Sequence, residues 1–165
     1  MKLWQLKEMQ HRYPHDYPTI VYEIESKHHW IDFMYDMISQ GKCERALGDS
    51  YNVGYVMLDN DQLQKTFQPM FDAMNLDLKI LSVYIHYASK DGKFAIHEHD
   101  KPHGVYYLQA PTKSGILFFP DFGEHFEPEP NHFRLIPKGI LHGINTHRNE
   151  MERIAITFQF EDIEF

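Results

Sequence analysis

From residue 79 onward, apolar and polar side chains alternate in short runs along the chain. Successive side chains of an extended strand point to opposite faces, so this alternation is typical of half-buried β-strands. Turn-forming clusters such as Lys90-Asp91-Gly92 and Pro137-Lys138-Gly139 separate the runs. The pattern predicts strands at residues 80–87, 93–99, 104–110, 115–120, 133–136, 140–144 and 153–160, with an acidic, proline-rich connector at 122–130.

The first 78 residues mix helical and extended patterns. Apolar residues recur at spacings of three and four in residues 30–41 and again after Asp59, which predicts two helices. Pro69 lies within the second pattern and is expected to kink or split it. Residues 19–24 and 54–58 are expected to be strands, whereas 1–17 and 41–54 are interpreted as irregular.

This order of elements predicts one α+β domain over residues 1–165. Residues 79–165 are expected to close into a double-stranded β-helix, or jelly roll. Residues 1–78 would form a support region whose N-terminal helices buttress one sheet.

Composition narrows the possible functions. The 165 residues are 42% hydrophobic and carry a formal net charge of −8, which argues against binding to a nucleic-acid backbone. The lone cysteine, Cys43, excludes an intrachain disulfide. We find no signal-peptide pattern and no apolar run approaching the roughly 18 residues of a membrane span. A cytoplasmic location is therefore expected, with the oligomeric state undetermined.

Three histidines form a candidate metal site. His97 and His99 are two residues apart, so their imidazoles share one face of a strand. His142 follows the turn at Pro137 and Gly139 and is the candidate third ligand. Imidazole nitrogens suit iron, zinc, nickel or copper. A β-bulge could instead turn Asp100 or Glu98 into the site, and His103 is a lesser candidate ligand.

The last predicted strand has two distinct faces. Ile154, Ile156, Phe158 and Phe160 form one face, and Arg153, Ala155, Thr157 and Gln159 form the other. An inward arginine is poor core, but its two-pronged donor group suits a carboxylate. The residues alone leave open whether Arg153 lines a socket or lies in solvent.

Taken together, His97-Glu98-His99, His142 and Arg153-Ile154-Ala155 resemble the Fe(II)/2-oxoglutarate-dependent oxygenases, especially their short prolyl-hydroxylase-like members. That family shows His-x-Asp/Glu, a gap close to the 45 residues between His97 and His142, a second histidine, and an arginine near the position of Arg153. The segments 104–108 and 153–158 also look like strands of the family. The resemblance covers roughly the second half of the chain and departs at His99, which replaces the carboxylate, and at Ala155, which replaces a serine.

The resemblance implies a dioxygenase, acting as a hydroxylase, that converts 2-oxoglutarate and O2 to succinate and CO2 while oxidising a C–H bond. Fe(II) would bind His97, His99 and His142, with ascorbate as the reductant in vitro. 2-Oxoglutarate would reach Arg153 and Thr157, and a tyrosine, Tyr84 or Tyr106, is a candidate for holding one of its carboxylates. The acceptor, a protein side chain or a small molecule, is not defined.

Two alternatives remain from the sequence. Pro137-x-Gly139-x-x-His142 and His97-x-His99 also resemble the cupin motifs, which would imply a metal-dependent dioxygenase or isomerase that uses no 2-oxoglutarate. A jelly-roll binding protein that has lost catalysis is the other alternative, since fold alone does not give function.

Overall fold

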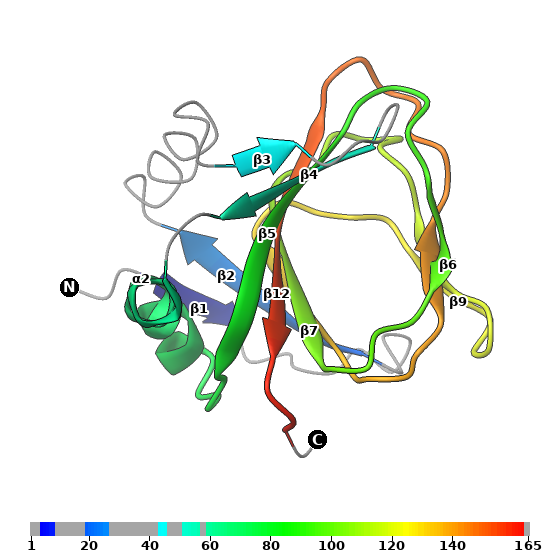
Figure 1. Ribbon diagram of the computed structural model, residues 1–165. Coiled ribbons are helices and arrows are strands. Elements are labelled where there is room, and N and C mark those ends of the chain that lie inside the picture. The colour runs from blue at the N-terminus through cyan, green and yellow to red at the C-terminus, as the bar shows by residue number, and fades with distance from the viewer. Residues whose placement is uncertain (1–3, 9–18, 27–42, 46–50, 57–58, 164–165) are drawn as a thin grey trace.

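Two β-sheets face each other in the computed structural model, which describes residues 4–8, 19–26, 43–45, 51–56 and 59–163 (Figure 1). The larger sheet has eight strands in the order β1-β2-β10-β7-β12-β5-β4-β3, and the smaller has four in the order β6-β11-β8-β9. The larger sheet contains β1 (Trp4–Glu8), β2 (Ile20–Ser26), β3 (Cys43–Arg45), β4 (Tyr51–Val56), β5 (Ile80–Ala88), β7 (His103–Gln109), β10 (His132–Ile136) and β12 (Arg153–Phe160). The smaller contains β6 (Phe94–His97), β8 (Leu117–Phe119), β9 (Glu124–Phe126) and β11 (His142–Ile144).

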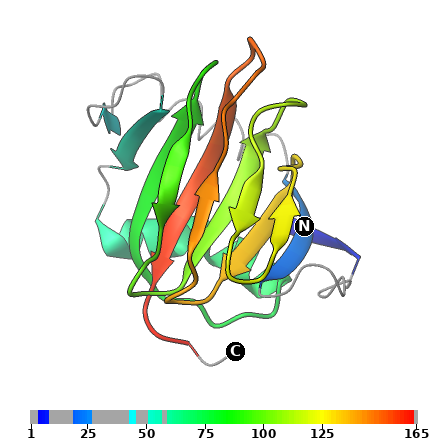
Figure 2. The ribbon, with the colours of Figure 1, turned by 90° about the vertical axis from the view of Figure 1, so that its right-hand side faces the viewer.

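The chain passes repeatedly between the two sheets, which confirms the predicted jelly roll. β5 continues into β6 of the smaller sheet, and the next strand, β7, is back in the larger one. β12 lies between β5 and β7 and pairs antiparallel with both. Figure 2 shows the strands of the smaller sheet in front of those of the larger sheet. One face of the larger sheet therefore looks into the space between the sheets.

The opposite face of the larger sheet is covered by helix α2 (Asn60–Ala73) (Figure 1). The Asp59 side chain caps the helix by accepting a hydrogen bond from the Gln62 backbone N–H at 2.9 Å. Phe67 and Phe71 pack edge-on against Phe158, with ring centroids 4.8 and 5.7 Å apart. This aromatic layer is the centre of the main core.

Helix α2 runs through Pro69 as one element, so the predicted split is wrong. The residues before and after the proline, including Phe67 and Met70, are buried against the same sheet. We attribute the continuity to this packing, which offsets the missing backbone hydrogen bond. The helix predicted at residues 30–41 lies outside the described residues.

Three strands lie in segments that the sequence pattern assigned to irregular structure. They are β1, within residues 1–17, β3, within 41–54, and β9, within 122–130. β4 also begins earlier than the expected 54–58, and β6 ends at His97 rather than His99. Among the described residues, no helix is long and apolar enough to cross a membrane.

Candidate metal centre

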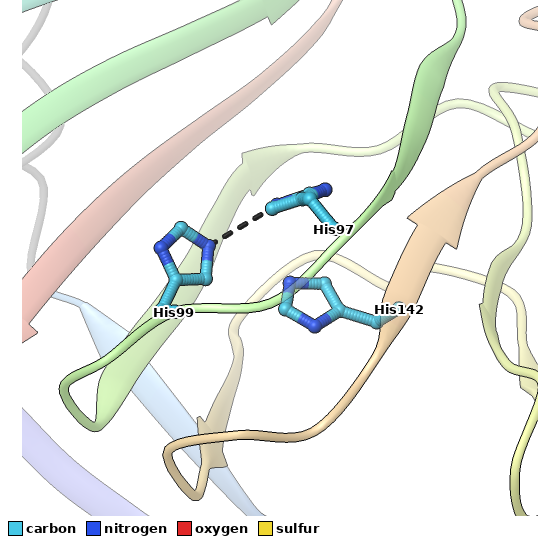
Figure 3. Close-up of side chains that lie close together, drawn as sticks. All are labelled: His97, His99 and His142. Atoms are coloured by element: carbon cyan, nitrogen blue, oxygen red, sulfur yellow. Dashed lines mark hydrogen bonds between the residues drawn. The ribbon is translucent and has the colours of Figure 1, made fainter.

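The pairing of β6 with β11 places two of the predicted ligands side by side. His97 lies directly opposite His142 in the antiparallel register. Opposed residues of this kind project from the same face of a sheet. Their imidazole centroids are 4.5 Å apart, and both rings point into the space between the sheets (Figure 3).

His99 joins the pair from the turn that follows β6. Its backbone carbonyl accepts a hydrogen bond at 2.8 Å from the N–H of Gly139, whose φ of +75° favours glycine. This bond ties the turn after β6 to the turn that precedes His142. The Nε2 atoms of His97 and His99 are 3.1 Å apart, and one nitrogen from each of His97, His99 and His142 lies within 4.8 Å of the others. The three residues predicted from sequence therefore converge on one point.

Backbone hydrogen bonds orient two of these imidazoles. Nδ1–H of His97 donates to the Ala95 carbonyl at 2.7 Å, and Nδ1–H of His142 donates to the Ile140 carbonyl at 2.7 Å. The proton is thereby held on Nδ1, which leaves the Nε2 lone pair for a metal. A set of three imidazoles without thiolate fits Fe(II), Ni(II), Zn(II) or Cu(II) better than Mg²⁺ or Ca²⁺.

The protonation of the site also suits metal binding. Burial lowers the pKa of His142 to about 4, although the hydrogen bond that the ring donates to the Ile140 carbonyl acts to raise it. Burial, followed by the neighbouring His97, lowers the pKa of His99. Both imidazoles are therefore neutral at neutral pH, which is the form that binds a metal.

The alternative carboxylate ligands lie outside the converging group. Glu98 and Asp100 are exposed and line an outer pocket together with His99, Lys138 and Gly139. Both follow the end of β6 at His97, and the charge of Asp100 acts on the neighbouring His99, whose pKa it raises against the larger effect of burial. Among the described residues, the group of side chains that converges on one point contains neither Glu98 nor Asp100, so a carboxylate ligand from either residue stays an untested alternative.

Arg153 lies in the wall of the same cavity as the three histidines. The cavity is lined by His86, Phe94, His97, His99, His103, Val105, Tyr107, Leu117, Ile136, His142, Ile144, Arg153, Ala155 and Thr157. Arg153 is 3% exposed, and its Nη1 donates to the Ser114 carbonyl. Within the described part of the chain, no carboxylate lies within ion-pair distance of this guanidinium. Thr157 is also buried on this face, as the alternation along the strand predicted.

The two predicted tyrosines have different positions. Tyr84 lines an adjoining cavity together with His86, His99 and Thr157, and its hydroxyl accepts a hydrogen bond from Ser82 Oγ at 2.9 Å. Tyr106 does not line either cavity, so its assignment to the site is corrected. It is fully buried in the main core, where its hydroxyl donates to Asn131 Oδ1 at 2.9 Å.

Tyr107 takes the place expected of Tyr106. It lies opposite Ala155 in the β7–β12 register, whereas Tyr106 lies opposite Ile156 on the core face. Tyr107 is 4% exposed and lines the histidine cavity. Burial raises the pKa of its hydroxyl, which nearby Arg153 and Arg134 partly oppose.

Two further histidines line the cavity: His86, which the sequence did not assign to the site, and His103, which it gave only as a lesser candidate ligand. Burial lowers the pKa of His86 to about 3, and Arg153, His99 and His97 lower it further. His103 begins β7 and is 4% exposed. Their positions on β5 and β7 follow from the strand register, which the sequence pattern does not give.

The fold is similar to that of several solved structures. No family model matches the sequence, and no curated protein matches it. An oxidoreductase of the 2OG-Fe(II) oxygenase family from Burkholderia pseudomallei superposes with a TM-score of 0.68 at 14% identity, covering 92% of this chain and 86% of that chain. The chain shares the fold of the 2OG-Fe(II) oxygenases.

Two more structures with this fold hold ligands relevant to the site. HygX from Streptomyces hygroscopicus, solved with nickel, 2-oxoglutarate and hygromycin B, matches at a TM-score of 0.62 and 11% identity, covering 89% of this chain and 84% of its own. The viral collagen prolyl hydroxylase of Paramecium Bursaria Chlorella virus-1, in complex with 2-oxoglutarate, matches at a TM-score of 0.57 and 12% identity. The match covers 82% of this chain and 90% of that chain. The resemblance noted in the sequence is thus confirmed at the level of the fold.

Proposed function

We propose that the protein is an Fe(II)- and 2-oxoglutarate-dependent oxygenase. The observation that carries this proposal is the cavity shared by three converging imidazoles and a buried guanidinium that has no carboxylate partner among the described residues. A metal site and an anion site in one enclosed space suit a co-substrate that is both a chelator and an acid. The matching structures with 2-oxoglutarate bound support this choice.

The residues would divide the work between the two parts of the cavity. His97, His99 and His142 would hold Fe(II), which with 2-oxoglutarate supplies the O2-dependent oxidation of a C–H bond. Arg153 would bind the carboxylate of 2-oxoglutarate that is distant from the iron. Thr157 and Tyr107, which line the same cavity, would add hydroxyl donors.

Charge supports a dianionic co-substrate. A divalent ion on three neutral imidazoles keeps its full charge, and Arg153 adds another, so the cavity would carry about three positive charges before the co-substrate enters. None of the residues that line the cavity is acidic. A dianion removes two of these charges. In the 2-oxoglutarate-dependent oxygenases, the carboxylate ligand neutralises one positive charge of the ion before the co-substrate binds. Three imidazoles do not, so the reduction potential of iron here would differ.

The acceptor would approach from the adjoining cavity. This second space is lined by Tyr84, His86, Phe94, His99, His103, Thr157, Phe158 and Gln159. It shares His86, Phe94, His99, His103 and Thr157 with the first cavity. A protein side chain or a small molecule remains the proposed acceptor class. A single cysteine is compatible with a reducing compartment, and a cytoplasmic location is part of this proposal.

The decisive experiment measures 2-oxoglutarate binding and turnover. Protein loaded anaerobically with Fe(II) should develop a weak visible charge-transfer band when 2-oxoglutarate is added. With O2 and ascorbate it should slowly produce succinate even without an acceptor. Replacing His99 by Ala should weaken iron binding sharply, whereas replacing the exposed Asp100 by Ala should not.

Two outcomes would reject parts of the proposal. A protein that binds one metal ion but shows no spectral response to 2-oxoglutarate would be a cupin-type metalloprotein. A protein that binds no metal would be a jelly-roll protein without this chemistry.

A further inference from the structure

His103 places a fourth imidazole beside the three converging histidines. It is the first residue of β7, in the larger sheet, whereas His97 and His142 belong to the smaller sheet. Its ring centroid is 4.1 Å from that of His99 and 5.0 Å from that of His142. The side chain lines both the metal cavity and the adjoining one. His103 therefore closes the site from the opposite sheet.

Hydrogen bonding leaves this imidazole unsatisfied. Nδ1 of His103 is enclosed without a partner, and neither of its ring nitrogens has a hydrogen bond to any described residue. His97 and His142, by contrast, each donate from Nδ1 to a backbone carbonyl. A buried polar group without a partner costs about 1–3 kcal/mol. Such a cost is understandable if a bound ion uses the nitrogen.

Ring spacings indicate that His103 belongs to the same coordination shell. With a metal–nitrogen distance of about 2.0–2.1 Å, imidazole centroids lie roughly 3.2 Å from the ion, hence about 4.5 Å apart at right angles and about 6.5 Å apart on opposite sides. The three predicted ligands have centroid separations of 4.5, 4.8 and 5.4 Å. The 4.1 and 5.0 Å separations of His103 are comparable.

His103 lies just outside the group of converging nitrogens. His103 is not one of the three residues whose nitrogens lie within 4.8 Å of one another, so its side chain must turn to coordinate.

We propose that His103 is a fourth metal ligand, making a four-imidazole site with His97, His99 and His142. This rests on the metal centre of the proposed function. Four neutral nitrogen donors favour Fe(II), Ni(II), Cu(II) or Zn(II). A six-coordinate ion would keep two positions, the number that the chelating end of a 2-oxo acid occupies.

The test counts nitrogen ligands and measures metal affinity without any turnover. Cu(II) is bound to the wild-type protein, and electron paramagnetic resonance resolves the nitrogen couplings. Zn(II) affinity is measured by competition with a chromophoric chelator. The variants are His103→Leu and, as a matched control from the wall of the same cavity, His86→Leu.

The proposal is supported if the wild type shows four coupled nitrogens and His103→Leu shows three. It also requires that the Zn(II) affinity of His103→Leu, and not that of His86→Leu, is at least about tenfold weaker than the wild-type affinity. Three nitrogens in the wild type would overturn it, whether or not the variant folds, and would leave the proposed function standing. Unchanged Zn(II) affinity in a folded His103→Leu protein would overturn it as well. A wild-type protein that binds neither ion would remove the proposed function together with it.

Discussion

Replacing Arg153 by Met should separate co-substrate binding from stability. The guanidinium is 3% exposed and donates to the Ser114 carbonyl, and it has no carboxylate partner within the described chain. Each charge-assisted hydrogen bond to a buried carboxylate contributes about 1.5–3 kcal/mol, so losing a two-pronged contact should raise the Kd of 2-oxoglutarate at least about 100-fold. 2-Oxopentanoate, which has the same length but lacks the second carboxylate, should bind the variant and the wild type equally.

The same substitution should change the stability of the ligand-free protein only slightly. The Ser114 carbonyl loses a donor, at a cost of about 1 kcal/mol. Removing a buried and unpaired charge recovers a comparable amount, and Met fills most of the vacated space. The free energy of unfolding, measured with urea, should therefore change by less than about 1 kcal/mol.

Arg134 provides the matched control for this prediction. It is 7% exposed, but its Nη1 donates to Thr19 Oγ1 at 2.6 Å and its guanidinium lies 4.1 Å from the ring centroid of Phe126. Arg134→Met should destabilise the protein clearly more than Arg153→Met does. If Arg153→Met instead lowers the unfolding free energy by about 3 kcal/mol or more and leaves 2-oxoglutarate affinity intact, Arg153 is structural and the proposed anion site is wrong.

Three further predictions concern stability. The metal-free protein should lose about 3 kcal/mol from His142 alone as the pH falls from 6.5 to 4, because the unfolded chain binds the proton at the ordinary pKa of 6.5 and the folded chain only near 4. A urea midpoint that stays constant from pH 7 to pH 4 would contradict this. Phe158→Ala should lower the free energy of unfolding by about 3–5 kcal/mol, because removal of the fully buried ring leaves a cavity beneath α2. A decrease of less than about 1 kcal/mol would refute that packing role. Asp59→Ala should cost about 0.5–2 kcal/mol through the lost helix cap, whereas Asp59→Asn should cost much less, as thermal unfolding of the two variants would test.

The strands that the sequence pattern missed are all at sheet edges. β1 and β3 end the larger sheet, and β9 ends the smaller one. An edge strand pairs on one side only and is often short or charged, which weakens the alternation that reveals interior strands. β9, for example, consists of Glu124, His125 and Phe126. β12, between β5 and β7, was predicted with its bounds and both faces.

Register explains why one tyrosine was assigned to the wrong face. Alternation along the chain shows that Tyr106 and Tyr107 point opposite ways, but it does not say which of them points inward. That choice depends on β12, where Ala155 pairs with Tyr107 and Ile156 with Tyr106. Such a pairing is a long-range property, and a local pattern cannot supply it. His97 and His99 were both assigned correctly to one site, although β6 ends at His97 and a backbone hydrogen bond from Gly139 holds the turn that carries His99.

The composition of the cavity wall indicates that the ligand-free site is maintained at a cost to stability. Five histidines and one arginine line the cavity, and no acidic residue among the described ones joins them. Burial keeps His86, His99, His103 and His142 neutral by lowering their pKa values. Nδ1 of His103 has no partner, and the guanidinium of Arg153 has the Ser114 carbonyl but no carboxylate among the described residues. A divalent ion would supply the imidazoles with a partner, and a dianion would then neutralise both the ion and Arg153. The positive charge of the ion attracts the dianion, so binding of the metal should precede and strengthen binding of the dianion. Because any ligand that binds only the folded state stabilises it, the two together should stabilise the fold more than either does alone.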